Sequence, residues 1–217
     1  EIEGLEFELQ QNLGVFGESF LGLPLNWIII GGNYVSLDAE VERSSMEMNN
    51  LSSLRFGNNL EDPDVFQEGG ALSKRSLYDQ PSFVANAFVT FDIEKTGTKI
   101  TLSQNWLGEQ LNRVGGLTSA QVGAADLYWD DFSSMSIVIE QKLGEHWKLR
   151  FSAKNINSPE RRLYEDPSFY NALLDSNLYR REQTTSEEDI LAPSAAGFTR
   201  SIQVVEPTYS ISLSGSF

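Results

Sequence analysis

The chain has 217 residues, a formal net charge of −15 and no cysteine. The negative charge argues against nucleic-acid binding, because nucleic-acid binders carry basic patches. The lack of cysteine excludes a disulfide framework, a thiolate metal site and a cysteine nucleophile. No run of about 18 apolar residues is present, as a transmembrane helix would require. The hydrophobic content of 40% suits a soluble domain, and it suits equally a membrane β-barrel, whose strands are only half apolar.

The first residues, Glu1 to Gly4, contain neither the basic region nor the apolar stretch of a secretory signal peptide. We therefore expect one of two situations. Either the protein is cytoplasmic, or the beginning of the polypeptide is missing from this sequence.

Alternation of apolar and polar residues predicts about seven β-strands, because successive side chains of a strand point to opposite faces. In chain order they are residues 4–12, 25–37, 82–92, 99–110, 128–142 and 147–155, and a last strand that begins after Arg200 and includes 208–217. The second strand alternates least cleanly, and there we place Ile28, Ile30, Gly32 and Tyr34 on the apolar face.

The last strand has the clearest pattern. Its odd positions are apolar or small, and every residue between them is serine or threonine. The stretch of about ten residues could cross a bilayer if tilted, with aromatic residues at both ends. Pro207 suits the end of a strand or a bulge, not a strand centre.

The connections between the predicted strands differ in length in a regular way. Those at 13–24, 93–98 and 143–146 are fairly short, whereas 38–81, 111–127 and 156–199 are longer, with helical pieces expected near 65–72. In an antiparallel meander alternate connections lie at opposite ends, so all long loops fall at one end. Outer-membrane barrels have this asymmetry.

Several stretches, in order, resemble the C-terminal part of a TonB-dependent outer-membrane receptor. They are 4–9 (GLEFEL), 32–38 (GNYVSLD), 81–87 (PSFVANA), 105–109 (NWLGE), 141–144 (QKLG), 147–157 (WKLRFSAKNIN) and 209–217 (YSISLSGSF). The resemblance implies a 22-stranded barrel around a plug, which binds a scarce ligand outside the cell and is driven by a periplasmic TonB-type energy-coupling protein. It also implies that the C-terminal signal Tyr209, Ile211, Leu213 and Phe217 is recognised by the barrel assembly machinery.

The strand count gives a separate reason to expect a fragment. A bacterial barrel needs an even number of strands, eight at least, and seven would leave two edges with unpaired backbone groups in lipid. We therefore expect residues 1–217 to be one portion of a single barrel domain, an open curved sheet that lacks the plug and the N-terminal strands. The residues expected to face outer-membrane lipid are Phe83, Val89, Phe91, Met135, Ile137, Ile139, Leu149 and Phe151.

Catalytic or metal-binding patterns are not evident, so we expect no enzyme activity and no cofactor. His146 lies in a predicted turn. Calcium at Asp130-Asp131 or at 187–189 is less expected than solvated acids. Glu6 and Glu8 are expected to line a wet interior. The arginine pairs at 161–162 and 180–181 are expected to form ion pairs within loops, and Trp27, Trp106, Trp129 and Trp147 to anchor at membrane interfaces. The sequence at 50–52 matches a glycosylation acceptor, a pattern common by chance.

The sequence thus predicts an all-β, partial transmembrane barrel in the outer membrane of a Gram-negative bacterium, part of an energy-coupled uptake receptor. A passive porin-like or adhesin barrel is the main alternative, and a soluble carbohydrate-binding β-sandwich is the third. The ligand stays open between siderophore, cobalamin, carbohydrate and peptide, and its contact residues are unknown.

Overall fold

The computed structural model describes residues 2–48, 70, 72–115, 125–166 and 199–216. Seven long strands form one antiparallel sheet in the order β1-β4-β6-β7-β10-β11-β14, so each strand pairs with the next long strand along the chain. This main sheet comprises β1 (Ile2–Asn12), β4 (Ile28–Glu42), β6 (Phe83–Ile93), β7 (Thr98–Leu107), β10 (Phe132–Leu143), β11 (Trp147–Lys154) and β14 (Thr208–Gly215). The predicted all-β, antiparallel class is confirmed.

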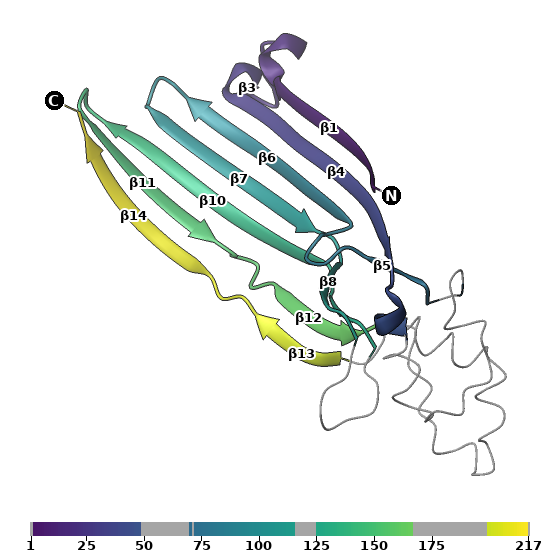
Figure 1. The fold of residues 1–217 in the computed structure, drawn as a ribbon. Helices are drawn as coiled ribbons and strands as arrows, with labels where there is room; N and C mark the ends of the chain where they lie inside the picture. The colour runs from purple at the N-terminus through teal and green to yellow at the C-terminus, as the bar shows by residue number, and fades with distance from the viewer. Residues whose placement is uncertain (1, 49–69, 71, 116–124, 167–198, 217) are drawn as a thin grey trace.

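The main sheet is curved and open (Figure 1). Over the described residues β1 and β14 lie at its two edges, and each pairs with a single strand along its length. The row of backbone groups on the outer side of each edge is available for pairing with a further strand.

Short connections lie at one end of the sheet. Residues 94–97 join β6 to β7, and 144–146 join β10 to β11. Residues 13–27 join β1 to β4 and contain the 3₁₀ turns η1 (Leu13–Phe16) and η2 (Leu25–Trp27), with the small hairpin β2 (Ser19–Phe20) and β3 (Leu23–Pro24) between them. The longer connections all leave from the other end, as predicted (Figure 1).

Four of the long strands continue beyond a bend. The main-sheet strands β7, β10, β11 and β14 have as continuations β8 (Gln110–Arg113), β9 (Leu127–Trp129), β12 (Glu160–Glu165) and β13 (Thr199–Val204). These short strands form a second sheet in the order β13-β12-β9-β8, which repeats the order of the strands they continue. At the β11–β12 bend, Asn155 and Ser158 have φ values of 57° and 44°. We call the second sheet the loop-end sheet.

The structure corrects several predicted boundaries. The predicted strands 99–110 and 128–142 are each interrupted at the bend, and 25–37 begins as η2 and continues to Glu42. The region 38–80, expected to be without regular strands, contributes the end of β4, which pairs with β5 (Lys74–Ser76), and a helical turn at 45–48. The helix expected near 65–72 lies mostly outside the described residues. No helix in the described part of the chain has the length and apolar character needed to cross a membrane.

Candidate functional site

One face of the main sheet is apolar across its whole width. Directly opposite residues of paired strands share a face, so the register identifies the members of each row. One row crosses six strands through Ile30, Val89, Leu102, Ile137, Ala153 and Tyr209. The next row is Ile28, Phe91, Ile100, Ile139, Phe151 and Ile211. Alternation in separate strands therefore adds up to one surface, which we call the apolar face.

The apolar face is also where the main sheet exposes its large hydrophobic side chains. Ile211 is 74% exposed and Leu5 is 67% exposed, and Ile2 is the only exposed large hydrophobic residue of the described main-sheet strands on the opposite face. A contiguous exposed apolar surface of this kind marks a protein or membrane interface.

The eight residues predicted to face lipid all lie on the apolar face: Phe83, Val89, Phe91, Met135, Ile137, Ile139, Leu149 and Phe151. Of the predicted C-terminal signal, Tyr209, Ile211 and Leu213 lie on the same face of β14, and Phe217 lies outside the described residues. Their contact with lipid or with an assembly factor stays a prediction.

Aromatic side chains lie toward both ends of the apolar face. At the end nearer the long connections Tyr34 stacks on Phe83, with ring centroids 6.0 Å apart, and Trp106 lies opposite Ala85 in the next strand. At the short-turn end Trp147 is opposite Gly215, and its ring occupies the space that a Cβ atom there would need. Trp129 differs, because it lies in β9 of the loop-end sheet.

The opposite face carries most of the polar side chains of the main sheet, and several of them are hydrogen-bonded across the strands, although Val35, Val84 and Val138 also lie on it. Asn86 Nδ2 donates to Asn33 Oδ1 at 2.8 Å, and the hydroxyls of Thr90 and Thr101 are 2.9 Å apart. Those of Ser152 and Ser210 are also 2.9 Å apart. Residues Glu6 and Glu8 point to this face from β1.

Charges of alternating sign cross four strands on the polar face near the short turns. Asp92 lies opposite Lys99, Lys99 opposite Glu140, and Glu140 opposite Arg150. The Lys99 Nζ to Asp92 Oδ2 distance is 3.6 Å, and Arg150 Nε lies 3.8 Å from Glu140 Oε1. Exposed pairs of this kind contribute about 0–1 kcal/mol each to the stability of the fold. Their main consequence is that this part of the face is charged and hydrophilic.

The bulky residue Phe88 on the polar face packs against a glycine of the neighbouring strand. Phe88 lies opposite Gly31, and a Cβ atom at Gly31 would come within 2.5 Å of the Phe88 ring. Glycine is therefore required where the ring lies against the neighbouring strand.

The loop-end sheet holds the small buried core of the described chain. Leu111 is fully buried and packs with Tyr128 and Tyr164, whose rings stack with centroids 6.2 Å apart. The core thus joins β8, β9 and β12, and Val114 packs against it.

Glu109 lies at the bend between β7 and β8 and connects three neighbouring segments. Its backbone N–H donates to Asp131 Oδ1 at 2.9 Å, its carbonyl accepts from the Ser82 N–H, and its carboxylate accepts from the Tyr164 hydroxyl. Burial, and then the negative charges of Asp166, Asp131 and Asp130, raise the pKa of Glu109 to about 7.

A small cavity lies beside this carboxylate, with a volume of about 100 Å³. It is lined by Leu37, Asp38, Ala39, Ser76, Leu77, Gln80, Ser82, Glu109 and Tyr128. Small-molecule sites typically have roughly 300–1,000 Å³, so the cavity has room for a few water-sized groups and not for a whole ligand of the expected classes.

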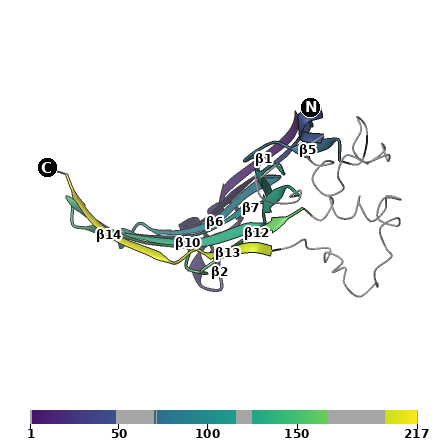
Figure 2. The same ribbon diagram turned by 60° about the horizontal axis from the view of Figure 1, so that its bottom comes forward.

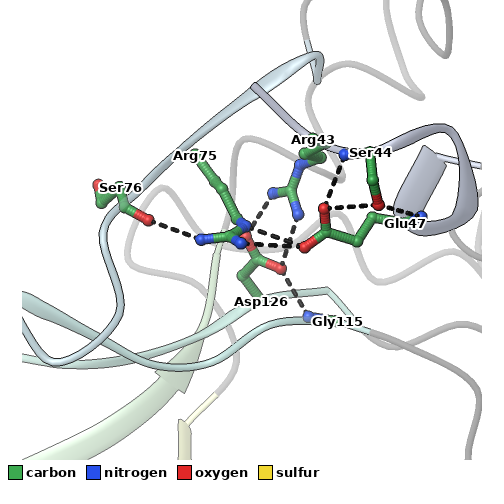
Figure 3. A network of polar contacts seen from close by, with 7 residues as sticks. All are labelled: Arg43, Ser44, Glu47, Arg75, Ser76, Gly115 and Asp126. Atoms are coloured by element: carbon green, nitrogen blue, oxygen red, sulfur yellow. Dashed lines mark hydrogen bonds and ion pairs between the residues drawn. The ribbon is translucent and has the colours of Figure 1, made fainter. Parts of the chain in front are cut away.

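A buried ion pair holds the end of β4 against the segment before β9 (Figure 3). The guanidinium of Arg43 pairs with the Asp126 carboxylate, and their side chains are only 4% and 1% exposed. The Gly115 N–H also donates to Asp126 Oδ1 at 2.6 Å. Nothing in the sequence pattern pointed to this pair, whose members are 83 positions apart.

The polar network continues at the helical turn 45–48, which it connects to β5. Ser44 and Glu47 form a capping box, in which the Ser44 N–H donates to Glu47 Oε2 at 2.7 Å. Arg75 of β5 then pairs with Glu47 Oε1 at 3.0 Å (Figure 3).

The predicted arginine pair 161–162 lies in strand β12 and not in a loop, and of its two members Arg162 contacts an acid and Arg161 an aromatic ring. Arg162 Nε donates to Asp130 Oδ2 at 2.8 Å, and Arg161 lies over the Trp129 ring, with its Cζ atom 4.6 Å from the centroid. Within the described ranges no group of three or more acidic or histidine side chains could hold a metal ion. His146 lies in the exposed turn 144–146. The pair 180–181, the acids 187–189 and the acceptor 50–52 lie outside the described residues.

A scan against protein-family models, a search of curated proteins and a search of solved structures each return no match for this chain. The family resemblance of the seven long strands therefore stays an expectation.

Proposed function

We propose that this chain forms a wall segment of a transmembrane β-barrel in the outer membrane of a Gram-negative bacterium. The observation that carries the proposal is the single apolar face, which spans seven strands and exposes its large side chains. The strands have 8 to 15 residues, comparable with the roughly 9–11 residues that a tilted strand needs to cross a bilayer. The hydrogen-bonded polar face then lines the interior.

The two open edges of the main sheet support the barrel. In lipid an unpaired backbone group costs several kcal/mol, so only closed sheets are stable there. We infer that further strands pair with the outer sides of β1 and β14 and close the wall, so that the whole protein has more strands than the main sheet.

In this proposal the barrel is part of an uptake receptor of the TonB-dependent kind. The receptor binds a scarce ligand such as a siderophore, cobalamin or carbohydrate. The support is the end-to-end asymmetry: all long connections, the loop-end sheet and its buried core lie at one end, where a receptor would receive a ligand. Energy coupling, through a periplasmic partner, rests on the resemblance of the strands alone.

Two experiments test the proposal. Solubility of the purified protein without detergent, as a stable monomer, would favour the soluble β-sandwich and overturn the barrel. If the protein is membrane-bound, growth of the deletion strain and its parent on limiting ferric siderophore, cobalamin or oligosaccharide tests uptake. A growth defect that is reproduced in the parent by dissipating the proton-motive force supports energy coupling. Unchanged growth on every ligand would favour the porin-like or adhesin alternative.

A further inference from the structure

The connection between β1 and β4 carries a second exposed apolar surface, separate from the apolar face. It is the β2–β3 hairpin with its flanking turn η1, and Figure 2 shows the hairpin below the strands of the sheet. Its exposed large hydrophobic residues are Val15, Phe16, Phe20, Leu21 and Leu23. Over 25 residues, from 13 to 37, Glu18 is the only charged side chain.

The tip of this hairpin is built in an unusual way. The two residues between β2 and β3, Leu21 and Gly22, have φ values of 48° and 82°. A two-residue loop with both φ values positive has the type I′ geometry, which favours Asn-Gly or Asp-Gly. Leucine is strained at a positive φ, and Leu21 is 88% exposed, so nothing within the described chain compensates the strain by packing.

A strained, fully exposed leucine at a position suited to asparagine points to a contact outside this chain. The chemistry of the contact follows from the side chains. The apolar side chains of the tip project from the molecule, and only one charged residue is nearby. The tip is therefore suited to bind a surface that accepts apolar groups without a specific shape. A lipid bilayer is such a surface, and a protein partner would require a complementary pocket.

The position of the hairpin agrees with a bilayer. It lies at the short-turn end, next to strands whose apolar face exposes Leu9 and Ile30, and its flanking residue Trp27 is half-buried. Aromatic residues of this kind are typical of the boundary between headgroups and acyl chains.

We propose that the β2–β3 hairpin inserts its tip, Phe20 and Leu21, into the headgroup–acyl boundary of the inner leaflet of the membrane that the main sheet spans. The inference rests on the proposed membrane-spanning function. It adds that one short-end connection anchors in lipid, whereas the polar turns 94–97 and 144–146 stay in water. Since Glu18 is the only charge, insertion does not depend on anionic lipid.

The test uses the full-length protein in vesicles of phosphatidylethanolamine and phosphatidylcholine. This chain has no cysteine, so in a full-length protein whose other cysteines, if any, are replaced, a single Leu21→Cys replacement can carry an environment-sensitive fluorophore. Matched probes are placed at Glu145→Cys, in a polar turn of the same end, and at Ile137→Cys, on the apolar face. Quenching is measured with phosphatidylcholine brominated near the headgroup end of its acyl chains, and separately with aqueous iodide.

We expect the Leu21 probe to be quenched several-fold more by brominated lipid than the Glu145 probe, and the Glu145 probe several-fold more by iodide. The Leu21→Cys result should not change when anionic phosphatidylglycerol is added. In a Phe20→Ser variant quenching of the same probe by lipid should fall, while the Ile137 probe is unaffected.

The outcomes separate this inference from the proposed function. An iodide-accessible Leu21 probe beside a lipid-quenched Ile137 probe would overturn the hairpin insertion and leave the membrane wall standing. An Ile137 probe that lipid does not quench would overturn both. A Leu21 probe that is shielded from iodide only in native envelopes, and never quenched by lipid, would identify a protein partner and also overturn the inference.

Discussion

Four strands of the main sheet continue beyond the bend as the four strands of the loop-end sheet, yet the two sheets bury opposite kinds of residue. In the main sheet the large hydrophobic side chains are exposed on one face, and the polar side chains of the other face bond to one another. In the loop-end sheet Leu111, Tyr128 and Tyr164 are buried, and the half-buried Arg161 and Arg162 lie over aromatic rings. Large hydrophobic side chains are therefore exposed on one side of the bend and buried on the other.

If the main sheet spans a membrane as proposed, the bend lies at the boundary between lipid and water. On one side of the bend, the loop-end sheet and the segments that contact it, which we call the cap, have a small buried core and are held by the Arg43–Asp126 pair and the Glu109 contacts. On the other side of the bend, the described residues form no buried cluster on either face of the main sheet, and in the proposed function the apolar face contacts lipid. A substitution on one side of the bend should therefore leave the other side largely unchanged.

The largest effect is expected from breaking the buried ion pair of the cap. Arg43→Met leaves Asp126 charged and buried, which typically costs about 3–5 kcal/mol. Lys74→Met removes one member of the Lys74–Glu40 pair, whose side chains are 57% and 53% exposed, and should change the stability little, because exposed ion pairs contribute little. Hydrogen exchange should show faster exchange in β8 and β9 for Arg43→Met and unchanged protection in β6 and β10. Equal loss in β6 would mean that cap and wall unfold together.

The next effect concerns the two faces of β10. Ile137→Lys places a charge at the centre of the apolar face and should lower the free energy of unfolding by about 2–4 kcal/mol if it lies near the bilayer midplane. Ser136→Lys, one residue away on the polar face, should cost far less. Urea unfolding of the full-length protein in vesicles measures both, and equal losses would refute the assignment of faces.

The sequence predicted the main sheet well because its alternation is a local property. Seven strands, their order of short and long connections and the parity of Ile28 and Ile30 all follow from neighbouring residues, and the register confirms that parity. Among the strands of the loop-end sheet, β12 was missed for the same reason. β12 reads Glu-Arg-Arg-Leu-Tyr-Glu, without alternation, and it exists because β9 and β13 flank it.

The contacts of the cap could not be predicted from local pattern at all. Glu109 contacts Tyr164, which is 55 positions away, and Arg43 contacts Asp126 across 83 positions. Such pairs depend on which strands the long connections bring together. The function of the apolar face could be proposed from the sequence, whereas the raised pKa of Glu109 required the structure.

A smaller effect is expected from the pH dependence of Glu109. Its pKa of about 7 in the folded protein exceeds the ordinary value of 4.5, so the folded state binds more protons between these pH values. The cap should therefore be more stable at pH 5 than at pH 8, losing stability as the pH rises through 7. After allowance for solvent screening of a half-buried group we expect about 1 kcal/mol. Glu109→Gln should flatten the pH profile of the protection factors in β8, which are corrected for the intrinsic pH dependence of exchange, and an unchanged profile would show that Glu109 is not the responsible group.

Removal of Phe217 should have the smallest effect on stability and a selective effect on assembly. We expect less receptor in the outer membrane, because the residue completes the proposed C-terminal signal. Ligand binding per assembled receptor should be nearly unchanged, because β14 ends at the short-turn end of the sheet, away from the long connections. Counting surface-exposed receptor and bound ligand separates the two quantities. Normal assembly with weakened binding would mean that the strand direction relative to the membrane is reversed.

The most direct test of the central claim is a nitroxide scan of β10 in lipid vesicles. One cysteine at a time is introduced from Ser134 to Glu140 and spin-labelled, and its accessibility to oxygen, which concentrates in lipid, is compared with that to an aqueous nickel chelate. The account predicts an oscillation with a period of two residues. Oxygen accessibility should peak at Met135, Ile137 and Ile139, and chelate accessibility at the positions between them. Equal accessibility of the two sets, or high chelate accessibility on the apolar face, would contradict a membrane-spanning wall.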